Sequence, residues 1–518
     1  MHNDMNETPR SRFTHLDGLP DRSNKIARAR QYAQWTNPSL FTDQEVGEGT
    51  VGELSQNSQS IGSGFINSLS NKLSTSLLSL TRPFFRLKVD PKIVEDLIQS
   101  KVIQDKTALD VELAQIEKKT VAQLDVMNLR PNLTHALQLS MVTGDVLIKI
   151  PDKGIDGKVK TFELRNYVVE RSLDGTLLQI IIKEKIRFKA LSEANQRVVQ
   201  TDGMRPEDNE NELDMYTRLY LDKNRWRLEQ SIDDAILTNT ASWNQDTFPY
   251  LVLPWSLRQG EMHGRGLIEA HAGDFAELER VSNAISKITG IISRILVLVN
   301  PNAMSSPQDL QAANDGDFVA GVEDDFHLLA FSEKVREVKF LSERQKDIEQ
   351  RLSKVFLVFT ARDSERTTAE EVRRTANELE SNLGGVFSSF AEGFQKPLAK
   401  ILLDRIDFKL SKDIEPVIVT GLDSLSRNSE LESVTRVIQA VAQLGGLPPE
   451  ILETLKLDSI INTIASAEGI EPKTFVHTQQ EIQASRQARQ QQEQQAMQAQ
   501  EAAKTAGNVV QEQAKQQV

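Results

Sequence analysis

Apolar residues recur at helical spacing over two long stretches in the second half of the chain. Over 274–299 they alternate three and four residues apart, and an Asn-Pro step ends the run. A second stripe of the same period occupies 334–356. Because this spacing places the apolar residues on one side of a helix, we predict two long helices over these ranges, joined by an insert over 300–333.

Basic residues follow the polar side of both predicted helices. Arg280, Lys287 and Arg294 are seven residues apart, opposite to the apolar stripe, and Lys339 and Lys346 repeat that spacing on the second helix. The ordinary interpretation is a solvated helix surface. Contact with a large charged partner is the alternative, and the pattern leaves both open.

The segment after the second helix contains no residue suited to a core. It reads ARDSERTT, with Arg362 and Arg366 flanking two acids. Thr368 and Glu371 then match a capping box, in which the hydroxyl accepts an amide hydrogen bond and the carboxylate reaches back to the cap. We predict an exposed charged loop over 357–367 and a helix that begins sharply at Thr368.

The insert between the two long helices is acidic. It contains DGDFVAGVEDDF, whose carboxylates include Asp315, Asp317, Asp324 and Asp325. The spacing does not fit an EF-hand calcium loop, which needs a third ligand at position five and glycine at position six. We predict an exposed acidic tip rather than a metal site.

The apolar period changes to about two over 144–255, and two Asp-Gly steps mark turns. We predict a β-rich domain there, preceded by helices and loops. The polar stretch 191–212 is expected to form a loop or a disordered tip. After Thr368 the helical pattern runs toward Phe408, with expected kinks at a Gly-Gly pair and at Pro397, and a short strand follows over 416–420. The Gln- and Ala-rich end, 478–518, lacks the apolar residues that a core requires.

Composition narrows the class of protein. With 518 residues the chain suggests several domains or an elongated subunit. The net charge of −13 argues against a tight nucleic-acid binder but allows a surface past which DNA slides. The chain has no cysteine, which excludes disulfides and thiolate metal sites, and no apolar run long enough for a membrane span. We expect a soluble assembly of a reducing compartment.

A search for catalytic motifs finds no phosphate-binding loop, no HExxH and no GxSxG. Gly264 and Gly266 form only a weak fragment of a nucleotide-binding loop, and His263 and His271 are spaced wrongly for a shared helical metal site. We expect no enzymatic activity, no cofactor and no metal.

The order of these segments, together with local motifs, resembles the portal (head-to-tail connector) proteins of short-tailed, podovirus-type bacteriophages. The motifs include QYAQWTNPSLF, YVVERSLDGTLLQ, HGRGLIE and ERTTAEEVRRTANELESNLGGVFSS, and they span 28–422. The resemblance implies an α+β portal fold, mainly helical. The first part would be a wing over 1–273, with its β-rich part at 144–255. Stem helices over 274–299 and 334–356 would flank a clip over 300–333. A tunnel loop over 357–367 would follow, then a long kinked helix and return strand of the wing over 368–424, a helical crown over 425–477 and a tail over 478–518.

The resemblance also implies a role. Such proteins form a ring of about twelve subunits at one capsid vertex, through which double-stranded DNA passes without sequence specificity during packaging and ejection. The clip and its four aspartates would meet the terminase and later the tail adaptor. The wing would contact capsid and scaffold proteins, and the crown would face internal core proteins. The protein would be assembled in the host cytoplasm, reside in the virion and contact no membrane.

The resemblance would place seven basic residues on the DNA channel: Arg362, Arg366, Lys339, Lys346, Arg280, Lys287 and Arg294. A ring needs two different complementary faces on each subunit, which two-sided long helices supply. The acidic balance avoids tight phosphate binding. Two alternatives remain: Arg362 and Arg366 pair with neighbouring acids, or the chain is a structural coiled-coil or adaptor protein without a channel.

Overall fold

The computed structural model describes residues 7–42, 57–79, 83–89, 92–94, 99–100, 106–155, 157–201, 212–292, 296–301, 306–312, 314, 326–329, 334–358, 383, 385–408 and 414–418. All of them belong to the first of two compact units, Met1–Leu422. The predicted crown and tail lie outside the described residues.

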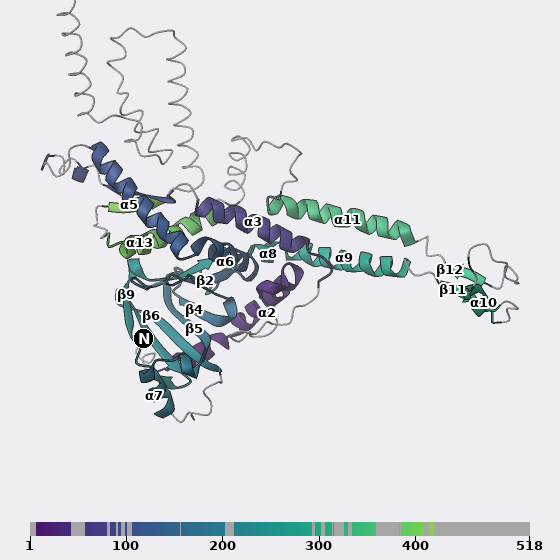
Figure 1. The fold of residues 1–518 in the computed structure, drawn as a ribbon, viewed down its shortest axis with the longest axis horizontal. Coiled ribbons are helices and arrows are strands. Elements are labelled where there is room, and N and C mark those ends of the chain that lie inside the picture. Colours follow the sequence, from purple (N-terminus) through teal and green to yellow (C-terminus); the bar gives the residue numbers. More distant parts are fainter. Residues whose placement is uncertain are drawn as a thin grey trace, which may run out of the picture. The chain divides into compact units, whose positions relative to one another are not determined.

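Helices form the first part of this unit (Figure 1). They are α1 (Pro9–Asp17), α2 (Pro20–Trp35), α3 (Ile61–Leu77), α5 (Lys106–Val126) and α6 (Leu129–Thr143). Both α1 and α2 begin with proline, whose fixed φ suits the first helical position and whose missing N–H costs nothing there. The Thr8 hydroxyl caps α1 by accepting a hydrogen bond from the Ser11 amide at 3.2 Å.

Two sheets follow. The smaller has the order β10-β2-β3 and is formed by β2 (Asp145–Lys149), β3 (Lys160–Phe162) and β10 (Tyr250–Pro254). The larger is an antiparallel, six-stranded sheet in the order β4-β5-β6-β7-β8, with β9 also paired to β7. Its strands are β4 (Tyr167–Arg171), β5 (Leu177–Arg187), β6 (Glu212–Asp222), β7 (Arg225–Ile232), β8 (Ala235–Ile236) and β9 (Ala241–Asn244).

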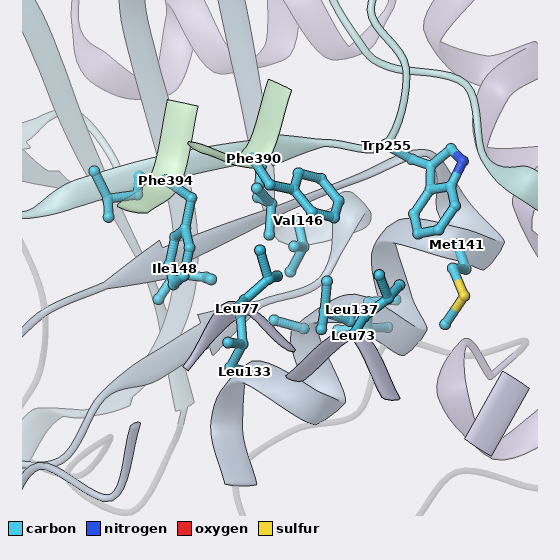
Figure 2. Close-up of a cluster of buried hydrophobic side chains, with 14 of the residues drawn as sticks. Leu73, Leu77, Leu133, Leu137, Met141, Val146, Ile148, Trp255, Phe390 and Phe394 are labelled. Atoms are coloured by element: carbon cyan, nitrogen blue, oxygen red, sulfur yellow. The ribbon is translucent and has the colours of Figure 1, made fainter. Parts of the chain in front are cut away.

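The main hydrophobic core lies where these layers meet (Figure 2). Leucines of α3 and α6 face Val146 and Ile148 of β2, and Trp255, Phe390 and Phe394 close the cluster. Both faces of β2 are covered, which explains its uninterrupted apolar run rather than an alternating pattern. Phe390 and Phe394 flank or lie in a π-helical turn, Ala391–Gln395, that leads into α13 (Lys396–Arg405), beside the kink predicted at Pro397.

Residues far apart in the chain pair in a two-stranded sheet of β1 (Phe85–Val89) and β13 (Ile414–Ile418). Leu87 lies opposite Pro416, and the Leu87 amide donates instead to the buried Glu117 carboxylate of α5 at 2.7 Å. Proline lacks a backbone N–H, and it is tolerated at position 416 of β13 because no hydrogen bond to β1 has to be donated from there. The strand predicted over 416–420 is therefore present, two residues earlier than expected.

The structure corrects two predictions. The polar stretch 191–212 is not all loop, since α7 (Glu193–Thr201) forms within it and buries Asn195 and Val199. The first long helix is also shorter than predicted. It ends at Ile292, and Leu296–Val299 forms strand β11, paired with β12 (Phe326–Leu329). A short apolar run is compatible with helix or strand by period alone, and its valines favour a strand once a partner is available.

The remaining elements are two short helices, α8 (Leu267–Ala270) and α10 (Pro307–Ala312), and the two long ones, α9 (Ala272–Ile292) and α11 (Lys334–Val355). Helices and antiparallel sheets are segregated along the chain rather than alternating. The predicted α+β class is confirmed.

Candidate nucleic-acid interface

The two long helices lie side by side and antiparallel (Figure 1). Arg344 pairs with Glu277 at 2.8 Å and Arg351 with Asp274 at 2.6 Å, so residue numbers rise along one helix as they fall along the other. These ion pairs are partly exposed, and such pairs contribute little to stability. Their effect here is to fix the register of the α9–α11 pair.

An aromatic cluster anchors this pair to the rest of the unit. Phe356, just after α11, is fully buried and stacks on Phe65 of α3, with 5.6 Å between ring centroids. Its ring meets that of Phe275 of α9 edge-on at 5.7 Å. Ile348 and Leu352 are also fully buried. The Val355 end of α11 is thus held firmly against α3 and α9.

Lys339 and Lys346 are exposed on the other side of α11. Each lies two residues before an apolar residue of the buried stripe, Leu341 and Ile348. Two residues correspond to about 200° around a helix, so these lysines point away from α9. This side of α11 carries charge and no exposed apolar residue.

Arg280 and Lys287 are exposed on α9, and each lies two residues after an apolar residue, Leu278 and Ile285. Arg280 donates to the carbonyl of Ala276 on its own helix at 3.3 Å. The structure therefore places four of the predicted channel residues on the surface of the α9–α11 pair. The other predicted site residues lie outside the described residues: Arg294, Arg362, Arg366, Asp315, Asp317, Asp324, Asp325, Thr368 and Glu371.

The end of α11 is a Schellman motif. The Val358 amide donates to the Ser353 carbonyl at 2.8 Å, and the Leu357 amide donates to the Lys354 carbonyl at 3.4 Å. Leu357 occupies the left-handed position, with φ of 53°, where glycine is usual. Its side chain is buried, and Lys72 of α3 donates to its carbonyl. The direction in which the chain leaves α11 is therefore fixed by contacts with α3.

The HGRG motif, which precedes α8, forms a buried polar junction with the start of β2. The Asp145 carboxylate has no exposed surface. It accepts hydrogen bonds from the Tyr167 hydroxyl at 2.7 Å, from His263 Nδ1 at 3.0 Å and from the Gly264 amide at 3.3 Å. Asp145 thus joins β2, β4 and the segment before α8.

Arg22 of α2 fixes the tautomer of His263. Its guanidinium approaches His263 Nε2 at 3.2 Å and also donates to the carbonyls of Tyr167, at 2.7 Å, and Leu164. A guanidinium only donates, so Nε2 accepts and Nδ1 carries the proton that is donated to Asp145. The N-terminal helices are in this way tied to both sheets.

Both ionisable partners have shifted pKa values. Burial alone would raise the pKa of the Asp145 carboxyl, but His263, the Tyr167 hydroxyl and Lys25 hold that pKa well below its usual range. Burial lowers the pKa of the His263 imidazole; the Asp145 carboxylate opposes this, Arg22 adds to it, and the pKa remains below its usual value. The junction is therefore built for a neutral histidine beside a carboxylate.

We expect the free energy of unfolding to fall as the pH drops below about 6.5, the usual pKa of histidine. The folded state keeps His263 neutral, so the unfolded chain binds more protons in that window and acid favours unfolding. Urea unfolding at about pH 7.5 and about pH 5.5 measures the difference. Burial also lowers the pKa of His135 and His271, so His263→Gln should reduce the pH dependence without abolishing it. An unchanged pH dependence in this variant would contradict the assignment.

The two glycines of HGRG serve close packing. A Cβ on Gly264 would lie 2.6 Å from the Gly144 carbonyl oxygen and 2.8 Å from Pro254 Cβ, and one on Gly266 would lie 3.1 Å from the Met141 carbonyl carbon. The sequence suggested only a weak nucleotide-binding fragment here. Two short motifs together indicate this junction: HGRG and the Gly144-Asp145 step. The Gly264 amide contacts the Asp145 carboxylate although the two residues are 119 positions apart in the chain.

Within the described residues, no group of three or more histidine and acidic side chains is arranged to hold a metal ion. None of the helices in this part of the chain is long and apolar enough to cross a membrane. The candidate site is the exposed surface of the α9–α11 pair.

Comparison with known proteins identifies the class first. Residues 7–476 match the family described as bacteriophage head to tail connecting protein, and the chain belongs to this family of phage structural proteins. Its relatives are portal proteins. That of Enterobacteria phage T3 is 31% identical over 479 residues, covering 90% of this chain and 87% of the relative. That of Escherichia phage T7 is 30% identical over 476 residues, covering 89% and 87%.

A portal protein of Pseudomonas phage phiKMV is also 30% identical, over 473 residues, covering 89% of this chain and 90% of the relative. Among solved structures, a chain of the virion of a native gene transfer agent particle overlaps with a TM-score of 0.38 at 10% identity. The overlap covers 83% of this chain and 91% of that chain. At that score, individual elements cannot be equated.

Proposed function

We propose that copies of this chain form a closed ring at the head-to-tail junction of a phage particle, with the α9–α11 pairs around a channel for double-stranded DNA. Membership of the connector family supports this proposal. The observation that carries the channel is the side of α11 with Lys339 and Lys346, which is exposed, charged and free of exposed apolar residues. Such a side offers DNA weak, exchangeable contacts.

The net negative charge of the chain favours DNA that passes through the ring over DNA that is bound tightly. Each phosphate that a protein neutralises strengthens binding and makes it more salt-dependent. A net charge of −13 per subunit opposes such accumulation, while a ring repeats each lysine as a circle of isolated charges. DNA is therefore held loosely and moves along the channel.

The finer assignments of the ring are also proposals. We propose about twelve subunits, as closed cyclic symmetry allows, with the acidic insert meeting the terminase and later the tail adaptor. The β-rich part would contact the capsid and scaffold, and the C-terminal helices the internal core proteins. The chain would act without catalysis, so energy for packaging would come from the terminase. Assembly would take place in the host cytoplasm.

Electron microscopy of the purified protein tests the ring. We expect closed rings with a central hole, because a repeated contact between two different surfaces of the chain closes into a ring when its rotation fits. A monodisperse monomer at micromolar concentration, across salt and scaffold conditions, would contradict the proposal. Solid assemblies without a hole would favour the alternative of a non-channel adaptor.

Neutralising the two lysines tests the channel. In Lys339→Gln/Lys346→Gln we expect normal rings, a severalfold weaker affinity for a short DNA duplex at low salt, and a smaller salt dependence of that affinity. The exposed Lys118 and Lys119 of α5 provide a matched control with the same charge change. Equal affinities in the two double variants would remove α11 from the channel wall.

A further inference from the structure

The turn between β4 and β5 carries an exposed leucine that the turn itself does not require. Leu173 is 80% exposed, more than any other large apolar residue in the described part of the chain. It occupies the second position of a β-turn in which the Gly175 amide donates to the Ser172 carbonyl at 2.9 Å. Serine at the first position and glycine at the fourth suit such a turn, whereas the second position accepts most residues. The apolar side chain of Leu173 therefore indicates a contact outside the fold.

This turn is rigidly built. The Asp174 carboxylate accepts hydrogen bonds from the Thr176 amide, at 3.0 Å, and from the Ser172 hydroxyl. The Ser172 amide donates to the Thr176 carbonyl at 2.9 Å. Gly175 supplies the positive φ, 88°, with which the chain turns back into β5. Leu173 is thus presented in a fixed position, which lowers the entropy cost of docking it on another surface.

A second loop lies against the turn and adds apolar surface. The Arg171 guanidinium donates to the carbonyls of Gly175, at 3.0 Å, and of Met262, at 3.1 Å, and the Arg171 amide donates to the Met262 sulfur at 3.2 Å. Met262 nevertheless remains 40% exposed. Leu257 of the same loop also lies against the turn, since its Cδ2 would be 3.6 Å from a Cβ at Gly175. We define Leu173, Leu257 and Met262 as the β4–β5 knob.

Exposed cations border this knob. Arg258 directly follows Leu257 and is exposed. Lys223, also exposed, lies at the tip of the β6–β7 turn. The β5–β6 register, with Gln179 opposite Tyr220, brings that tip to the same end of the sheet as the β4–β5 turn. Within the described residues, neither Arg258 nor Lys223 forms an ion pair.

The acids of the same loops are already engaged. Asp222 pairs with Arg227 at 2.7 Å. Glu261 pairs with Arg265 at 2.6 Å. Asp174 is held inside its own turn. Although the whole chain carries a net charge of −13, this end of the sheet presents an apolar centre with a basic border, which is complementary to an apolar recess bordered by carboxylates.

We propose that the β4–β5 knob docks on a protein of the phage head whose surface carries an apolar recess bordered by carboxylates. Leu173 fills the recess as the buried centre of the contact, and Arg258 and Lys223 face the carboxylates at its rim. The inference rests on the proposed function, because a head-to-tail connector has to hold a head protein as well as its own copies. It adds the residues that make this contact and the chemistry of the partner surface.

Replacing the exposed leucine tests the contact. Leu173→Asp places an acid against the carboxylates of the partner, and the exposure of Leu173 predicts unchanged thermal melting and unchanged rings. After co-expression with the head-shell proteins of the same phage, we expect the ratio of connector to shell protein in purified shells to fall about tenfold. The matched control is Ile155→Asp, because Ile155 is also an exposed apolar residue of a loop, at 57%. It should leave that ratio unchanged.

Photo-cross-linking in infected cells identifies the occupant. A benzophenone amino acid in place of Leu173 should cross-link to a head-protein peptide that contains both apolar and acidic residues, well above the background at Ile155. Adding Lys223→Glu and Arg258→Glu should lower the yield severalfold. A cross-link to another copy of this chain would assign the knob to the subunit interface and contradict the proposal. A partner peptide without acidic residues, or a yield no higher than at Ile155, would also overturn it.

The outcomes separate this inference from the proposed function. If the unmodified chain forms no rings, the proposed function is wrong. If rings form, and rings of Leu173→Asp enter head shells as often as those of Ile155→Asp, only the docking of the knob is wrong. Loss of rings in Leu173→Asp, with thermal melting unchanged, would place Leu173 between subunits and equally contradict the inference.

Discussion

Replacing Gly144 by Ala is expected to lower the free energy of unfolding by about 3–5 kcal/mol, from backbone strain and overpacking together. Gly144 ends α6 with φ of 102°, a conformation that an L side chain rarely adopts. A Cβ there would overlap the Gly264 carbonyl oxygen and lie 2.9 Å from its carbon. Neither backbone can move freely, because Asp145 and the Trp255 amide tie both segments to β2 and β10.

Two glycines provide matched controls for this substitution. Gly154 also has positive φ, 76°, but a Cβ there would meet nothing within 4 Å, so Gly154→Ala should cost about 1 kcal/mol from the backbone alone. Gly273 lies in α9 with open space around it, and Gly273→Ala should stabilise the protein by up to about 1 kcal/mol. Urea unfolding of the three variants measures the differences. A Gly144→Ala cost no larger than that of Gly154→Ala would show that the close approach contributes nothing.

The elements that sequence predicts best are those whose own residues decide their structure. The seven-residue spacing on α9 and α11 is local, and it correctly indicated two long helices and the exposure of Arg280, Lys287, Lys339 and Lys346. The same period misled at residues 296–299. There the deciding factor was pairing with Phe326–Leu329, about 30 residues away, which no local pattern contains.

The polar junction illustrates the same limit for a site. HGRG and the Gly144-Asp145 step are each short and ambiguous, and their role appears only when the fold brings Asp145 and Gly264, 119 positions apart in the chain, into contact. Arg22 is further away still, on α2. In the sequence, His263, Gly264 and Gly266 resemble parts of a metal or nucleotide site, whereas in the fold they join the layers of the unit.

For the basic residues predicted to line the channel, the sequence indicates that their side chains are exposed. It does not indicate which molecule they contact. A basic residue at an outward helical position is exposed whether it faces DNA, water or a second subunit. What distinguishes the two sides of the α9–α11 pair is apolar exposure, at Phe340 and Ile291, which appears only when both helices are placed.

Asp145→Ala is expected to be the most damaging removal of a charge from the described residues, at about 3–5 kcal/mol. The variant would leave the Tyr167 hydroxyl, His263 Nδ1–H and the Gly264 amide buried without an acceptor, and each such group costs about 1–3 kcal/mol. Lys25, whose pKa burial already lowers, would lose a nearby countercharge. Urea unfolding at neutral pH measures the cost.

Acid provides the internal check on this prediction. Because the folded state holds the pKa of Asp145 below its usual range, the stability from its charge is present above about pH 4 and is lost as the pH falls further. The difference between wild type and Asp145→Ala should therefore shrink toward low pH. The matched control is Asp246→Ala, which removes an exposed carboxylate paired with Lys400 at 2.5 Å and should cost no more than about 1 kcal/mol. If Asp145→Ala is as mild as this control at neutral pH, the buried junction does not hold the two sheets and the N-terminal helices together.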